Sequence, residues 1–189
     1  MRRYVDTYMR LWGSPKPVIV QVQGFCLGGG SDLALCADLI VCSDDCRIGY
    51  PPARVWGSPT TAMWTYRLGL ERSKRLLLTG DPIDGPTAVI WGLASESVPE
   101  DELEAAGAKL ASRVARLPSN QLMMETLVNS VYEQMGMTTT QLIGTLLDGT
   151  ARHTPEGTAF SERVVDDLPG AIADRDGPFG DYGQGERTA

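Results

Sequence analysis

Three consecutive glycines, Gly28 to Gly30, lie between a stretch with the pattern of a β-strand and a stretch with the pattern of a helix. The preceding residues 18–24, VIVQVQG, alternate apolar and polar side chains and are rich in β-branched residues, which predicts a strand that ends at Gly24. The following run SDLALCADL favours a short helix, and LIVCS favours a second strand. This order predicts an α/β fold whose glycine turn lies at the end of a strand, where α/β proteins tend to bind ligands.

The length of 189 residues and the hydrophobic content of 42% indicate one globular domain with a substantial core. The formal net charge of −7 argues against a general nucleic-acid binder, because neutralising phosphates needs a basic face. One segment, residues 47–75, is locally basic, and it is either a solvated face or a surface that meets phosphates. Its charged side chains are Arg47, Arg54, Arg67, Arg72, Lys74 and Arg75, against the single acid Glu71.

Residues 1–15 carry positive charge without the continuous apolar segment of a signal peptide, and no stretch of the chain reaches transmembrane length. We therefore expect a cytoplasmic protein that does not bind membranes. The four cysteines, Cys26, Cys36, Cys42 and Cys46, crowd into one segment without CxxC spacing. They are better explained as buried reduced thiols than as a zinc site, so no metal is expected.

The periodicity predicts helices over residues 2–12, 99–117, 119–135 and 138–152, the last opened by a capping box from Thr138 to Gln141. A further short helix is expected after Asp84, which is placed to cap it. The expected organisation is a domain over residues 1–167, with an α/β core over 13–100 and helices over 101–167. The Gly, Pro and Asp content of residues 168–189 predicts a loosely ordered tail.

Two chemistries for the glycine turn fit the sequence poorly. Phosphate binding would favour a GxGxxG or Gly-Lys-Ser/Thr pattern, and residues 18–46 contain no Lys or Arg. A nucleophilic Ser31 with His153, the only histidine, as its base would need glycine at position 33, where the chain has Leu33.

A third chemistry, an oxyanion hole, needs no basic residue. Glycines at the start of a helix leave backbone N–H groups free, and the helix dipole reinforces them. Such donors stabilise a carbonyl that becomes an enolate. Asp32 lies two residues after the last glycine, where its carboxylate is either an acid or base of the site or simply an acid that caps the first turn of the helix.

Three blocks of sequence, residues 16–51, 67–99 and 154–163, resemble the enoyl-CoA hydratase/isomerase, or crotonase, superfamily in the order in which its members carry them. The resemblance covers roughly residues 13–165. It implies a crotonase-like (ClpP/crotonase) α/β fold, a spiral core of β-β-α units followed by a C-terminal helical region. It also implies an acyl-CoA thioester as substrate, no separate cofactor, and a homo-oligomer, either a trimer or a hexamer.

By the same resemblance, Gly29 supplies one N–H of the oxyanion hole, and Asp32 stands where hydratases have one of their two catalytic glutamates. Substrate contacts are expected from Leu27, Gly28, Pro52 and Trp56. The default reaction is hydration of a 2-enoyl-CoA in fatty-acid metabolism, with the carbonyl held as an enolate-like oxyanion.

The chain departs from the family pattern at three points. Asp32 is one methylene shorter than glutamate, about 1.5 Å of reach, and a misplacement on that scale costs on the order of 10²-fold in rate. Pro52 falls where the second hydratase carboxylate is expected, and residues 46–70 contain no Asp or Glu. The family's N-terminal portion, with the other oxyanion N–H, is expected to be missing. The alternative function is therefore a catalytically inactive or truncated homologue that serves as an acyl-CoA-binding or oligomerisation module.

Overall fold

The computed structural model describes residues 2–180, and its centre is a small parallel β-structure. Strands β1 (Ile19–Val22), β3 (Leu39–Ser43) and β5 (Glu96–Val98) form a three-stranded sheet in the order β1-β3-β5. Strands β2 (Phe25–Leu27) and β4 (Arg47–Gly49) form a second, two-stranded parallel sheet. Consecutive strands therefore alternate between the two sheets.

This alternation produces two successive β-β-α units. The first is β1, β2 and helix α2 (Gly29–Ala34), and the second is β3, β4 and helix α3 (Met63–Thr79), which follows the short 3-10 helix η1 (Pro51–Arg54). The α/β class and the β-β-α core are as predicted. The sequence pattern treated residues 18–24 as one strand, but β1 ends at Val22 and Gly24, with φ of 58°, turns the chain into β2.

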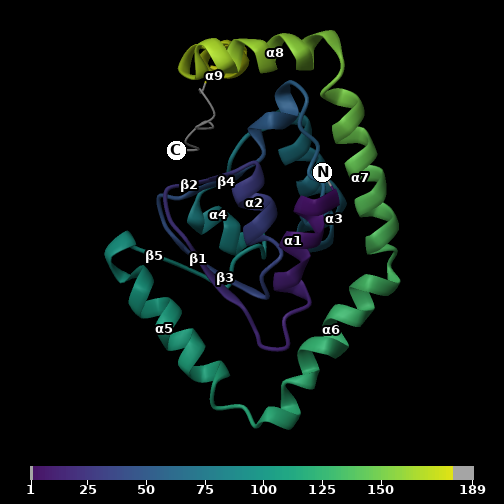
Figure 1. Cartoon of the computed structure of the whole chain (residues 1–189). Helices are drawn as coiled ribbons and strands as arrows, with labels where there is room; N and C mark the ends of the chain where they lie inside the picture. Colours follow the sequence, from purple (N-terminus) through teal and green to yellow (C-terminus); the bar gives the residue numbers. More distant parts are fainter. Residues whose placement is uncertain (1, 181–189) are drawn as a thin grey trace.

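The remaining helices lie around this core, and Figure 1 shows α5 to α8 following its outside as a continuous frame. Their bounds are α1 (Arg2–Trp12), α4 (Gly85–Ile90), α5 (Leu103–Val114), α6 (Met123–Gln134), α7 (Met137–Ala151), α8 (Pro155–Asp166) and α9 (Leu168–Asp176). Asp84 caps α4 as predicted, because its side chain accepts a hydrogen bond from the Thr87 N–H. No helix among residues 2–180 combines the length and the apolar character needed to cross a membrane.

The core gathers the apolar faces of α2, α3 and the strands. Trp64, Leu35 and Ile48 are almost completely buried in it. All four cysteines are buried free thiols, in agreement with the prediction that they act as small apolar side chains. A smaller cluster of Val41, Leu103 and Ala106 packs α5 against the central strand β3.

Two local predictions are wrong. Helix α7 begins at Met137 after Gly136, whose φ of 89° ends the preceding turn, so Thr138 lies inside the helix instead of capping it. Residues 168–180, predicted to be loosely ordered, form α9 and a 3-10 turn over Gly177–Phe179. Their Pro and Gly residues stand at helix ends, where both are compatible with helix formation. Residues 181–189 of the predicted tail lie outside the described residues.

The locally basic segment is divided between core and surface. The Arg54 side chain is only 1% exposed and is ion-paired with Asp81 and Asp176. Arg67 is half-buried and donates to the carbonyl oxygens of Leu35 and Ala37. The exposed basic side chains of the segment are Arg72, Lys74 and Arg75. This segment therefore supplies structural ion pairs and hydrogen bonds as well as a solvated face.

Candidate functional site

The glycine turn depends on Gly28, the residue that precedes α2. Its φ of 57° and ψ of −120° form a conformation that side-chain-bearing residues rarely adopt. A Cβ atom there would lie 3.3 Å from Cγ of Pro52. The Gly28 N–H donates to the Gly49 carbonyl at 3.2 Å, which holds the turn against β4.

The next two glycines form the first turn of α2. Helix geometry leaves the N–H groups of this turn without a carbonyl partner inside the helix, and the first helical bond runs from Asp32 N–H to the Gly28 carbonyl at 3.0 Å. A Cβ atom on Gly29 would lie 3.3 Å from the Tyr8 hydroxyl, whereas one on Gly30 would meet no atom within 4 Å. The turn thus presents bare backbone beneath the hydroxyl of Tyr8 on α1.

Asp32 is only 3% exposed, yet its carboxylate is held by another segment of the chain. Thr61 Oγ1 donates to Asp32 Oδ1 at 3.0 Å. Burial raises the pKa of Asp32 from its usual 3.8 to about 7, against the opposing hydrogen bonds from the Thr61 hydroxyl and the Thr60 N–H. At neutral pH this side chain can therefore both give and accept a proton.

Four of the residues singled out from the sequence line one cavity of about 450 Å³, namely Gly29, Asp32, Pro52 and Trp56. The described residues on its wall do not include Leu27, which ends β2, or Gly28, which packs against Pro52. The structure thus brings together the proposed oxyanion donor, the proposed acid and two of the four proposed substrate contacts.

Two side chains of the same cavity were missed by the sequence reasoning, Asp148 of α7 and Arg152, which directly follows that helix. Asp148 is 1% exposed and accepts hydrogen bonds from Ser58 N–H at 3.2 Å and from Arg152 Nε at 2.8 Å. The Arg152 guanidinium lies 3.7 Å from the centre of the Trp56 ring. Although residues 46–70 contain no acid, the cavity therefore has two carboxylates, Asp32 and Asp148. A lone acid in the apolar run LIGTLLDGTA was the available signal.

Two of the tyrosines that line the cavity, Tyr8 and Tyr50, are affected by the charge of Asp32. Burial, and then the charge of Asp32, raises the pKa of both Tyr8 and Tyr50 above the usual value for a phenol. Tyr50 donates its hydroxyl hydrogen to the Ser58 carbonyl at 3.1 Å. Both phenols consequently stay protonated at neutral pH and remain hydrogen-bond donors.

The structure does not form the Ser31–His153 pair, in agreement with the poor fit of the sequence to that chemistry. Ser31 is fully buried, and its hydroxyl lies 2.7 Å from the Gly28 carbonyl and 3.0 Å from the Gly49 carbonyl, so it fastens the glycine turn to β4. His153 is exposed at the end of α7, with Nδ1 2.7 Å from the Gly149 carbonyl. The two side chains belong to separate local networks.

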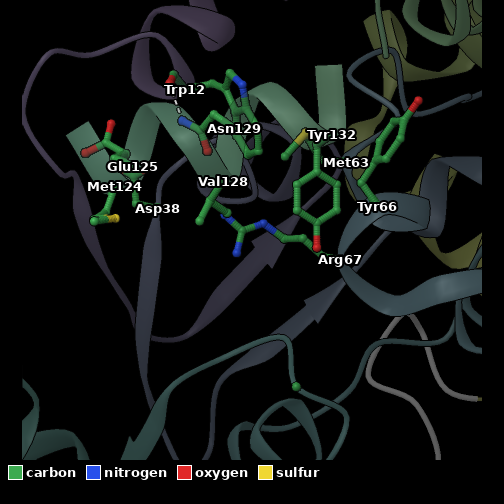
Figure 2. A pocket seen from close by; sticks show the side chains of 11 residues that line it. Trp12, Asp38, Met63, Tyr66, Arg67, Met124, Glu125, Val128, Asn129 and Tyr132 are labelled. Carbon is green, nitrogen blue, oxygen red and sulfur yellow. Dashed lines mark hydrogen bonds between the residues drawn. The ribbon is translucent and has the colours of Figure 1, made fainter. Parts of the chain in front are cut away.

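A second cavity of about 410 Å³ lies between α1, α3 and α6, and Figure 2 shows it from close by. Asn129 of α6 donates to the Trp12 carbonyl at 3.1 Å across one end, and Tyr66 and Arg67 of α3 lie on the opposite wall (Figure 2). Of the aromatic residues near position 60, Trp56 lines the Asp32 cavity, Tyr66 lines this second one, and Trp64 is in the core. The second cavity contains none of the residues predicted to act on substrate.

Comparison with known proteins gives a consistent answer. The sequence profile described as enoyl-CoA hydratase/isomerase matches residues 1–163. A solved enoyl-CoA hydratase from Mycobacterium smegmatis superposes with a TM-score of 0.95 at 41% identity, over 100% of this chain and 65% of that one.

Curated relatives agree with that structure. The 2,3-dehydroadipyl-CoA hydratase of Escherichia coli is 29% identical over 176 residues, 87% of this chain and 69% of that protein. The carnitinyl-CoA dehydratase of Proteus mirabilis is 34% identical over 103 residues, 53% of this chain and 40% of that protein. The chain thus spans only part of each relative. With a profile match over most of its length and this degree of structural likeness, the chain belongs to the enoyl-CoA hydratase/isomerase family.

Proposed function

We propose that this chain binds 2-enoyl-CoA thioesters in the Asp32 cavity and adds water to their double bond. The observation that carries the proposal is the placement of a buried carboxyl group, whose pKa is about 7, on the same cavity wall as the glycine that begins α2. A thioester carbonyl needs hydrogen-bond donors where negative charge develops, and the conjugated double bond needs a group that moves a proton. The cavity offers both.

In this proposal the Gly29 N–H is one donor to the thioester oxygen, and the dipole of α2 adds to its effect. The bare backbone at Gly29 and Gly30 lets the thioester approach the helix end. Asp32 carries the proton between water and substrate. Aspartate is shorter than glutamate, but the hydrogen bond from Thr61 fixes the orientation of the Asp32 carboxylate. No cofactor besides the coenzyme A of the substrate takes part.

The proposed partners are the acyl-CoA and further copies of the chain. Helices α6 and α7 expose large apolar side chains, among them Met123 at 62%, Leu127 at 62% and Leu146 at 61%. Several large apolar side chains exposed on two consecutive helices are typical of a protein–protein interface, which supports a homo-oligomer, with a trimer or a hexamer as the expected forms. The proposed setting is the cytoplasm.

The test is a spectrophotometric hydration assay with crotonyl-CoA and longer 2-enoyl-CoA substrates, together with calorimetric titration of the same thioesters. We expect measurable hydration by the parent chain, loss of about 10²-fold or more in kcat for Asp32→Ala, and a comparable loss for Gly29→Pro, which removes the N–H. Asp45→Ala, which removes an exposed acid outside the cavity lining, is the matched control and is expected to leave the rate unchanged.

Three outcomes contradict different parts of this proposal. Absence of both thioester binding and turnover contradicts the substrate class. Turnover that is insensitive to Asp32→Ala contradicts the role of Asp32 while leaving the substrate class intact. Binding without turnover corresponds to the alternative function, a non-catalytic acyl-CoA-binding module.

A further inference from the structure

A second acidic side chain, Asp148, lines the cavity that contains Asp32. It lies in the last part of α7 and is 1% exposed. Acidic residues are rarely buried unless they are paired or have a chemical role. Asp148 is paired, with Arg152 Nε at 2.8 Å, and the pair lies on the cavity wall and not in the core.

The position of Asp148 is fixed by one face of α7. Gly144, one turn earlier, approaches residues 59–60 so closely that a Cβ atom on it would lie 3.1 Å from the Pro59 carbonyl oxygen. Asp148 then accepts from the Ser58 N–H, and Arg152, one turn later, covers the Trp56 ring. The spacing of four residues places these three side-chain positions on the same side of the helix.

The same short segment of chain anchors both carboxylates of the cavity. Ser58 N–H donates to Asp148 at 3.2 Å, and Thr61 Oγ1 donates to Asp32 at 3.0 Å. The charge of Asp148 also raises the pKa of Asp32 and of Tyr50, which agrees with this proximity. Residues 58–61 therefore hold two carboxylates of different elements, α2 and α7, toward one space.

We propose that Asp148 is the second carboxylate of the site and that it holds the water molecule that adds to the thioester, an assignment that rests on the proposed function. Each carboxylate oxygen accepts two hydrogen bonds, and the bonds from Ser58 and Arg152 use one position on each oxygen. Each oxygen of Asp148 thus keeps one acceptor position, and a water molecule in the cavity can donate a hydrogen bond to it. The acid expected near Pro52 is replaced by one from a distant helix.

The step balances with water and the thioester as the only reactants. The water oxygen forms a bond to C3 while the electrons of the C2–C3 double bond move toward the carbonyl oxygen, which the α2 backbone stabilises as an enolate. One proton of the water passes to the ionised Asp32. The enolate electron pair then takes that proton at C2 and restores the carbonyl, which returns Asp32 to its starting state. Asp148 keeps its charge throughout and orients the water.

The test compares Asp148→Asn with Asp38→Asn. Asparagine at 148 still offers an oxygen to the Ser58 N–H but loses the second acceptor. Asp38 is a matched control because its carboxylate also accepts from a backbone N–H, that of Val18 at 2.6 Å, outside the Asp32 cavity. We expect kcat for crotonyl-CoA hydration to fall about 10²-fold in Asp148→Asn, with KM and the thioester Kd within about twofold of the parent. Asp38→Asn should keep the parent kcat.

Two further readouts separate this role from a structural one. The double variant Asp148→Asn/Arg152→Gln removes both partners of the ion pair and so leaves no unpaired cation. We expect its melting temperature and thioester Kd to stay close to those of the parent, which shows an intact cavity, while kcat stays low. In Asp148→Asn, the rise of kcat with pH that reports ionisation of Asp32 should move to lower pH, because a neighbouring negative charge has been removed.

An unchanged kcat in Asp148→Asn would overturn the assignment and leave the proposed function standing. A lower melting temperature together with weaker thioester binding and a higher KM would also overturn it, because these changes indicate a purely structural pair. A parent chain that binds the thioester without hydrating it overturns the role of Asp148 and the proposed hydration but not the substrate class, whereas a parent chain that binds no thioester overturns both proposals entirely.

Discussion

Arg54 Nη1 and Asp176 Oδ1 lie 3.0 Å apart although the two residues are 122 positions apart in the sequence, and their side chains are 1% and 0% exposed. Arg54 ends η1, the turn that carries Pro52, and Asp176 ends α9. Asp81 and the ring of Phe179, 4.1 Å from the guanidinium carbon, surround the same arginine. This buried network fastens the last described helix to the wall of the Asp32 cavity.

We expect Asp176→Asn to destabilise the protein by about 3 kcal/mol, because breaking a buried pair leaves a cation with reduced compensation. Urea unfolding followed by circular dichroism measures this change. Asp174→Asn is the comparison, since its ion pair with Arg163 is at the surface and its loss should cost less than about 1 kcal/mol. Equal stability of the two variants would contradict a structural role for the buried pair.

Stability should depend on pH through Asp32. Its pKa rises from 3.8 to about 7 on folding, so between about pH 4 and pH 7 the folded state holds a proton that the unfolded state has released. Raising the pH across this window therefore lowers stability, and Asp32→Asn, which does not titrate, lacks this loss. The melting temperature of Asp32→Asn minus that of the parent should increase from pH 4.5 to pH 7.5 by calorimetry. A difference that is constant or decreases with pH would show that the carboxyl is not buried as described.

Two neighbouring glycines should respond oppositely to the same substitution. Gly28→Ala places a Cβ atom in a left-handed conformation and 3.3 Å from Pro52, so we expect a loss of about 1 to 2 kcal/mol in unfolding free energy. Gly30→Ala lies inside α2 and meets no atom within 4 Å, so stability should hold or rise by up to about 1 kcal/mol. Thermal unfolding of both variants is the measurement, and a stable Gly28→Ala would argue against this turn geometry.

The contact between α7 and residues 58–60 can be tested in the same manner. Gly144→Ala should push the helix from the Pro59 carbonyl, cost about 1 to 3 kcal/mol and lower the rate of hydration through the displacement of Asp148. Gly149→Ala, on the same helix, meets no atom within 4 Å and should be neutral or stabilising. Unfolding and the crotonyl-CoA assay together provide the readout. A hydration rate unaffected by Gly144→Ala would mean that the position of α7 is irrelevant to the reaction.

Local signals in the sequence were sufficient for much of the fold. The alternation of β1, the glycines at the start of α2 and the Asp84 cap depend on neighbours within a few residues, so they can be recognised without the rest of the chain. The three-residue strands β2 and β4 were missed because a run that short shows no period. The cap predicted at Thr138 failed because Gly136 had already turned the chain.

The sequence by itself determined the family resemblance, the glycine turn and the position of Asp32 two residues after it, because each of these is recognised within short stretches of neighbouring residues. Only the tertiary structure decided that α9 is held by Arg54 and that Asp148 lines the Asp32 cavity. Both relations join residues about one hundred positions apart or more. Such contacts are set by how helices pack against the core, which leaves no periodic or spacing signal in the residues themselves. The second carboxylate of the cavity was thus visible only once α7 was placed against residues 58–60.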